Sequence, residues 1–121
     1  RRNLSMSEYL FNNPEDRKFD DNEVELEKFY NNVNDFFGEN VFLLDENNQK
    51  SLIKQKVTSM FKSNGVRIDL LRLRQLIDTK VDLLEKDLKE TPENLDMQKT
   101  ISELKEQQEL TKKLFHMCEH A

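Results

Sequence analysis

Residues near the carboxyl end of the chain have the types and spacing of a zinc site. The run HMCEH, residues 116–120, matches an H-x-x-E-H pattern in which two histidines bind the metal and the glutamate acts as a base. Only one residue follows His120, which leaves no downstream third ligand, and the preceding residues form a charged amphipathic helix. Cys118 points away from both histidines on a helical wheel. We therefore expect no metal and no cofactor, and we interpret the histidines as a helix end.

Two further patterns of charged residues have a chemical interpretation. The run RRNLS places two arginines three and four residues before Ser5, so Ser5 is a candidate phosphorylation site for a basophilic kinase. Residues 50–80 hold eight basic and two acidic side chains, a net charge of +6, although the whole chain has −5. The candidate residues for an anionic ligand are Lys50, Lys54, Lys56, Arg67 and Arg74. Nucleic acid or an anionic membrane would be the partner of such a patch.

The sequence contains no glycine-rich phosphate loop, no Ser/His/Asp set and no nucleotide fingerprint, so we expect neither an enzyme nor a small-molecule substrate. Its 121 residues suit one domain. With only two glycines and two prolines, the chain lacks the turn residues that a β-rich domain needs, and an all-α fold is expected. Cys118 is the single cysteine and cannot form an internal disulfide, which favours an intracellular location in the cytoplasm or nucleus.

Apolar residues that recur at helical spacing predict four helices behind an irregular arm. Residues 1–19 are expected to form a partly ordered arm, and residues 20–121 a single helical domain. The first helix, 22–37, would be capped by Asp20 and would end at Gly38. An apolar connection, 41–44, leads to a second helix, 46–63, which Asp45 would cap and the run SNG at 63–65 would end. The expected buried face of that helix is Ile53, Val57, Met60 and Phe61.

The remaining residues predict a long antiparallel hairpin of two helices, 66–90 and 92–118, with Thr91 as the cap of the second and Pro92 at its first position. An apolar stripe on the first consists of Val66, Leu70, Leu73, Ile77, Val81, Leu84 and Leu88, and Leu76 and Leu83 widen it to an arc of roughly 160°. A stripe this wide should contact two neighbouring helices. Arg67 and Arg74 lie on one flank of the stripe and Arg72 on the other, and an acidic first helix would be a natural neighbour for these arginines.

The last helix has one stripe, Met97, Ile101, Leu104, Gln108, Thr111, Phe115 and Cys118, and a second ridge, Leu110, Leu114 and Met117. Two ridges on one helix favour either four-helix packing or a partner chain. The sequence thus predicts an all-α, four-helix bundle-like domain with some coiled-coil character. Its predicted function is that of a non-catalytic interaction or scaffolding module, an adaptor or complex subunit from a larger protein. It would bind a partner helix, or form a homo- or hetero-oligomer, through an apolar groove formed by Leu76, Leu83, Leu110, Leu114 and Met117. The alternative is nucleic-acid or anionic-membrane binding through residues 50–80.

Overall fold

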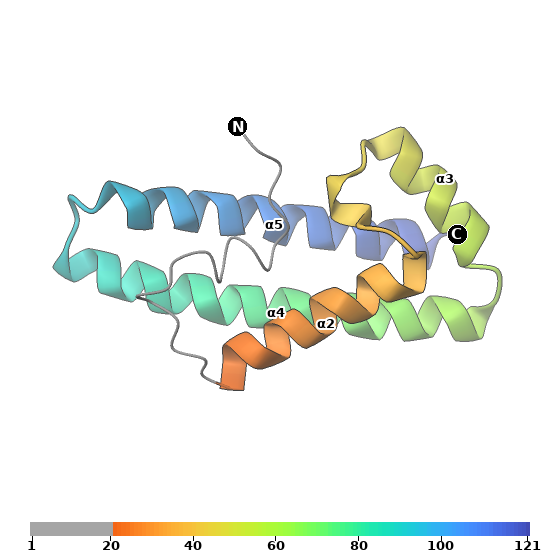
Figure 1. Ribbon diagram of the computed structural model, residues 1–121, viewed down its shortest axis with the longest axis horizontal. Coiled ribbons are helices and arrows are strands. Elements are labelled where there is room, and N and C mark those ends of the chain that lie inside the picture. The colour runs from red at the N-terminus through yellow and green to blue at the C-terminus, as the bar shows by residue number, and fades with distance from the viewer. Residues whose placement is uncertain (1–20) are drawn as a thin grey trace.

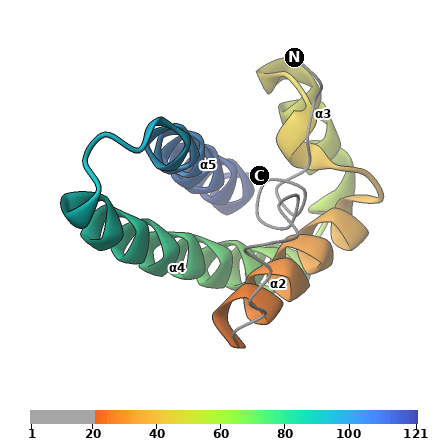
Figure 2. The same ribbon diagram turned by 60° about the vertical axis from the view of Figure 1, so that its left-hand side comes forward.

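Two long helices lie side by side and antiparallel, and the shorter helices pack on one half of that hairpin (Figure 1). The computed structural model describes residues 21–121; the expected arm, the Asp20 cap and Ser5 lie outside the described residues. In chain order the elements are α2 (Asp21–Phe37), the 3-10 helix η2 (Val41–Leu43), α3 (Glu46–Lys56), α4 (Met60–Glu90) and α5 (Leu95–Glu119). From residue 21 onward there is no strand, so the all-α fold with a long helical hairpin is confirmed. Figure 2 shows α2 crossing α4, with α3 beyond the end of α2.

The first described helix and the connection after it follow the sequence pattern. Leu26, Tyr30, Val33 and Phe37, spaced 4-3-4, are all buried on the inner face of α2. Gly38 ends the helix with a φ of +76°, a conformation that favours glycine. In the connection, Val41 and Phe42 are buried while Leu43 is exposed, and the side-chain nitrogen of Gln49 donates a hydrogen bond of 3.0 Å to the carbonyl of Val41.

The predicted boundary between the second and third helices is wrong. α3 ends at Lys56, and α4 begins at Met60 and continues through Gly65 to Glu90. The hydroxyl of Ser59 accepts a hydrogen bond of 3.2 Å from the backbone N–H of Lys62, which makes Ser59 the N-cap of α4. Gly65 can adopt helical backbone angles, so it does not have to end a helix once this cap has started one. As a consequence, Met60 and Phe61 are not buried: their exposed fractions are 75% and 87%.

The turn of the hairpin differs from the prediction by three residues. α4 ends at Glu90 as expected, but Thr91 is the C-cap of α4 and not the N-cap of the next helix. α5 begins at Leu95 because the side chain of Asn94 accepts a hydrogen bond of 3.1 Å from the backbone N–H of Met97. Pro92 therefore lies in the turn between the helices, a common position just beyond a helix C-cap.

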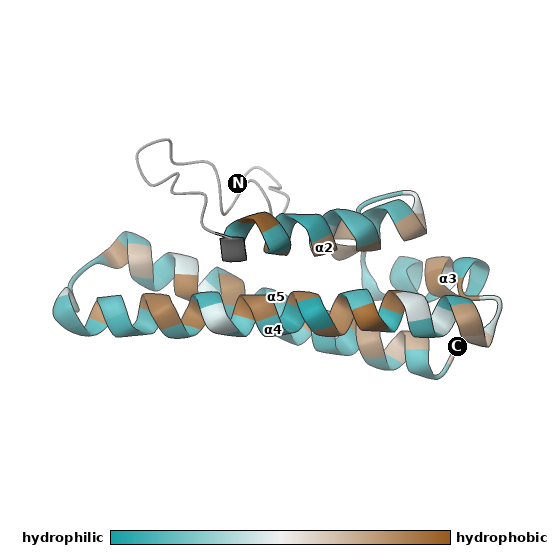
Figure 3. Ribbon diagram, turned by 90° about the horizontal axis from the view of Figure 1, so that it is seen from below, coloured by the Kyte–Doolittle hydropathy of each residue, from teal (hydrophilic) through white to brown (hydrophobic). Residues whose placement is uncertain are grey.

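The core lies where α2, α3 and the hairpin meet. Hydrophobic residues recur at intervals along these helices (Figure 3). Its α4 and α5 members are Val66, Leu70, Leu73, Leu76, Ile77, Val81, Ile101, Leu104, Leu114 and Cys118. The polar residues of the α5 stripe are satisfied: Thr111 donates to the carbonyl of Gln107 (2.6 Å), and Gln108 donates to a carboxylate oxygen of Asp78 (2.6 Å). The Gln108–Asp78 bond joins the two long helices and helps to fix their register.

Candidate partner-binding face of α4

Four of the eight large hydrophobic residues that are exposed among residues 21–121 lie on the first half of α4. They are Met60, Phe61, Ile68 and Leu71, with exposed fractions of 75%, 87%, 65% and 39%. At about 100° per residue they fall within an arc of roughly 100°, on the side of α4 opposite its buried stripe. The other elements that contact α4 pack on its buried side, so this apolar face is left in contact with solvent.

The spacing on this face is that of a coiled-coil seam. Phe61, Asn64, Ile68, Leu71 and Gln75 follow intervals of 3-4-3-4, and all five are exposed. This is the interval at which one helix presents core residues to a single partner helix. We call these five residues the α4 seam. The two polar members are uncharged, and a Cβ added at the neighbouring Gly65 would meet no atom within 4 Å, so the surface there is open.

Arginines lie at both edges of the α4 seam. On one edge, Arg67 approaches Glu119 of α5 (3.5 Å), and its guanidinium lies over the ring of Phe115, 5.7 Å from the centroid. On the other edge, Arg72 forms an ion pair of 2.7 Å with Glu25 of α2. The expected contact with the acidic first helix is therefore present for Arg72, whereas the carboxylate beside Arg67 belongs to α5. Because these side chains border the buried stripe, they also border the exposed seam on the other side of the helix.

The residues predicted to form an apolar groove do not share one exposed surface. Leu76 and Leu114 belong to the core, with exposed fractions of 3% and 0%, so a partner cannot reach them while the domain is folded. Leu110 and Met117 are half-buried against the same core, and only Leu83 is well exposed, at 49%. The α4 seam was not among the predicted surfaces, because the sequence pattern placed Phe61 on a buried face and a helix break at Gly65. The 3-4-3-4 interval from Phe61 to Gln75 was the signal that could have found it.

The five candidate residues for an anionic ligand are distributed over several places. Lys50 and Lys54 line a groove of about 320 Å³ together with Met117 and His120, and Lys50 is 3.8 Å from Glu46. The ammonium of Lys56 lies beside Gly38 at the end of α2. The remaining two, Arg67 and Arg74, are on α4, and Arg67 is already paired with Glu119.

The histidine pair lies at the exposed end of α5. His116 and His120 each have a ring nitrogen 3.6 Å from the same oxygen of Glu119, and both side chains are mostly exposed. Cys118 lies between them in sequence but is buried, and burial raises the pKa of its thiol to about 12. Over the described part of the chain, no group of three or more His, Cys, Asp or Glu residues is placed to hold a metal ion.

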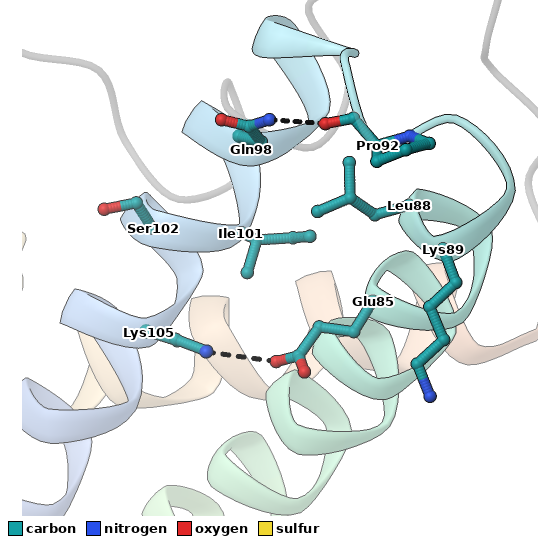
Figure 4. A pocket seen from close by; sticks show the side chains of 8 residues that line it. All are labelled: Glu85, Leu88, Lys89, Pro92, Gln98, Ile101, Ser102 and Lys105. Atoms are coloured by element: carbon teal, nitrogen blue, oxygen red, sulfur yellow. Dashed lines mark hydrogen bonds and ion pairs between the residues drawn. The ribbon is translucent and has the colours of Figure 1, made fainter.

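A second groove, of about 600 Å³, lies between α4 and α5 near their turn (Figure 4). Leu88, Pro92 and Ile101 supply its apolar wall. Two contacts join polar groups within the groove: Lys105 is 3.1 Å from Glu85, and Gln98 donates a hydrogen bond of 2.7 Å to the carbonyl of Pro92 (Figure 4). This groove can accept an apolar side chain, but it offers no nucleophile with an adjacent base.

Comparison of the chain with protein families, with curated proteins and with solved structures found no match. Within residues 21–121, no helix is both long and apolar enough to cross a membrane. The fold and the surface define the class of an all-α domain that carries an exposed, coiled-coil-like seam. What such a domain does must be inferred from the chemistry of that surface.

Proposed function

We propose that this chain is a non-catalytic protein–protein interaction module whose α4 seam packs against a helix of a partner protein. The observation that carries the proposal is the pair Phe61 and Ile68, which are 87% and 65% exposed at the spacing of a coiled-coil seam. In this role the chain would be an adaptor or scaffold subunit of an intracellular complex. The presence of a single cysteine, which cannot form an internal disulfide, supports the intracellular setting.

Burial by a partner helix would give these side chains a stabilising environment that the domain itself does not provide. Removing a large apolar side chain from water contributes roughly 1.5–3 kcal/mol. Phe61, Ile68 and Leu71 lie within the two heptads of the α4 seam. Part of the free energy gained by burying them is offset by the loss of translational and rotational freedom on association. A seam of this length therefore suits a transient interface or one part of a larger interface.

A nucleic acid or an anionic membrane is the competing partner for the basic segment 50–80. Two observations make it the weaker candidate. The five basic residues are not gathered at one place, because Lys50 and Lys54 line a groove beside α3 while Arg67 and Arg74 lie on α4. A phosphate surface would also leave Phe61 and Ile68 without an apolar cover.

The test uses a monomeric helical peptide with leucine at its heptad core positions and uncharged polar residues beside them. Fluorescence anisotropy would measure its binding to the intact chain and to Ile68→Asp. We expect Ile68→Asp to weaken binding by about 10–100-fold, since it removes one apolar anchor. Leu95→Asp is the matched control, because Leu95 is also an exposed apolar residue (73%) but lies on α5, outside the seam.

The midpoint temperature of thermal unfolding of both variants should stay close to that of the parent chain, because neither side chain belongs to the core. Equal binding by Ile68→Asp and the parent chain would contradict the proposal. So would the absence of binding by the parent chain at millimolar peptide.

A further inference from the structure

The charged residues that α4 itself places at the two edges of the α4 seam are all arginines. Phe61 and Ile68 are seven residues apart and so occupy the same core position in two successive heptads. In that register Arg67, Arg72 and Arg74 occupy positions that directly flank the core. In coiled coils, these flanking positions decide which partner is accepted, through ion pairs with the other helix. Between residues 60 and 75 the only acidic residue is Asp69, which is half-buried rather than exposed at the seam.

The three arginines keep hydrogen-bonding capacity for a further carboxylate. A guanidinium carries five N–H donors. Arg67 donates to Asn64, a member of the seam, and to Glu119, while Arg72 donates to Glu25. These are exposed contacts that hold little energy and that an incoming carboxylate can share. Arg74 has no ion pair with any residue in the described part of the chain.

We propose, building on the function proposed above, that the partner of the α4 seam is an acidic amphipathic helix. Its apolar residues would cover Phe61, Ile68 and Leu71, and its aspartates or glutamates would flank those residues opposite the arginines. Charge complementarity of this kind steers association and excludes partners of the wrong sign.

The same charges argue against two other occupants. A second copy of this chain, packed on the seam by a two-fold axis, would bring the arginines of one copy against those of the other, and like charges at flanking positions repel. The arm of this chain, residues 1–19, has four basic and three acidic side chains, so its net charge is +1 and it offers no charge complement to the arginines. A separate acidic chain is the partner that matches both the apolar core and the basic edges.

The test compares two peptides that share the same leucine core and differ only at the flanking positions, which are all glutamate in one and all lysine in the other. Anisotropy with the intact chain should show at least about tenfold tighter binding of the glutamate peptide, and the difference should shrink as salt is added. The triple variant Arg67→Glu, Arg72→Glu and Arg74→Glu should reverse the order of the two peptides. Substituting lysine at the same three positions should preserve the original order.

A second triple variant controls for net charge. Lys54→Glu, Lys86→Glu and Lys99→Glu change the charge of the chain by the same amount, at exposed positions away from the seam, and should leave the order of the peptides unchanged. If this control reverses the order as the arginine variant does, the preference comes from overall charge and the inference is wrong.

The outcomes separate this inference from the proposed function. If both charged peptides bind equally and Ile68→Asp weakens both, the seam binds helices but the acidic partner is wrong. If no peptide binds, both proposals fail. A dimer in sedimentation velocity that Ile68→Asp dissociates would make a second copy the occupant. Binding of duplex DNA that the arginine variant abolishes and Ile68→Asp leaves intact would make nucleic acid the partner, and either result overturns the inference.

Discussion

The two glycines of this chain should respond in opposite directions to replacement by alanine. Gly65 lies inside α4, is exposed, and has open space around the position of an added Cβ. Glycine in an exposed helix interior is less favourable than alanine by about 0.5–1 kcal/mol, so Gly65→Ala should raise the free energy of unfolding by that amount. Gly38 has a φ of +76°, and an L residue in this conformation costs about 1–2 kcal/mol.

Gly38→Ala should therefore lower the free energy of unfolding by about 1 kcal/mol, after part of the cost is offset by a less flexible unfolded chain. The nearest atom to its added Cβ is the ammonium of Lys56 at 4.0 Å, so no collision contributes to the effect. Urea unfolding followed by circular dichroism at 222 nm measures both changes, and an unchanged m-value would show that the comparison is valid.

Comparing Gly65→Ala with Gly38→Ala tests whether α4 continues through Gly65, as in the structure, or whether a helix ends there, as the sequence alone suggested. If the run SNG ended a helix with Gly65 in the left-handed conformation, Gly65→Ala would destabilise the chain as much as Gly38→Ala does. A loss of about 1 kcal/mol in both variants would therefore refute a continuous α4 from Met60 to Glu90, and the α4 seam that depends on this continuity would fail with it.

Two further predictions follow from burial. Leu73→Ala should lower the free energy of unfolding by about 2–5 kcal/mol, because Leu73 is fully buried. Leu71→Ala, two residues away, should lower it clearly less, because Leu71 is 39% exposed. Equal losses in urea unfolding would mean that α4 is rotated about its axis. Burial raises the pKa of Cys118 to about 12, so its thiol should resist iodoacetamide in the native protein at pH 9, where an ordinary thiol is half ionised. The same thiol should react readily in concentrated urea, and mass spectrometry would measure the difference. Rapid labelling of the native protein would contradict the burial of Cys118. Because the folded state holds this proton more tightly, the stability that Cys118 contributes is complete below pH 9 and is lost as the pH rises from about 9 toward 12.

Local sequence patterns were enough to predict most of the fold. Leu26, Tyr30 and Val33 define the inner face of α2 by spacing alone, and the same is true of Leu70, Leu73 and Ile77 on α4. These predictions hold because a helix that leaves one apolar stripe unburied loses several kcal/mol, so the stripe dictates the orientation.

The predicted helix boundaries were wrong where two local capping signals compete. Ser59 and Gly65 can each mark the edge of a helix, and the sequence does not say which signal dominates. In the folded chain Ser59 caps α4, and the first turn of α4 then places the hydroxyl of Ser63 3.0 Å from the carbonyl of Cys118. A contact between residues this far apart in sequence cannot be seen in a local pattern. The Asn94 cap likewise prevailed over Thr91 and Pro92.

The sequence by itself determined that the protein is helical, that its last two helices form a hairpin, and which leucines of α4 face inward, because these follow from periodicity and from the scarcity of turn residues. Only the tertiary structure decided which apolar residues stay in solvent. α4 has apolar side chains on two faces, and spacing alone cannot say which face the other helices will cover. Packing of α2 and α5 on one side buried Leu76 and Leu114 and left Phe61 and Ile68 exposed, and so moved the candidate partner surface from the predicted groove to the α4 seam.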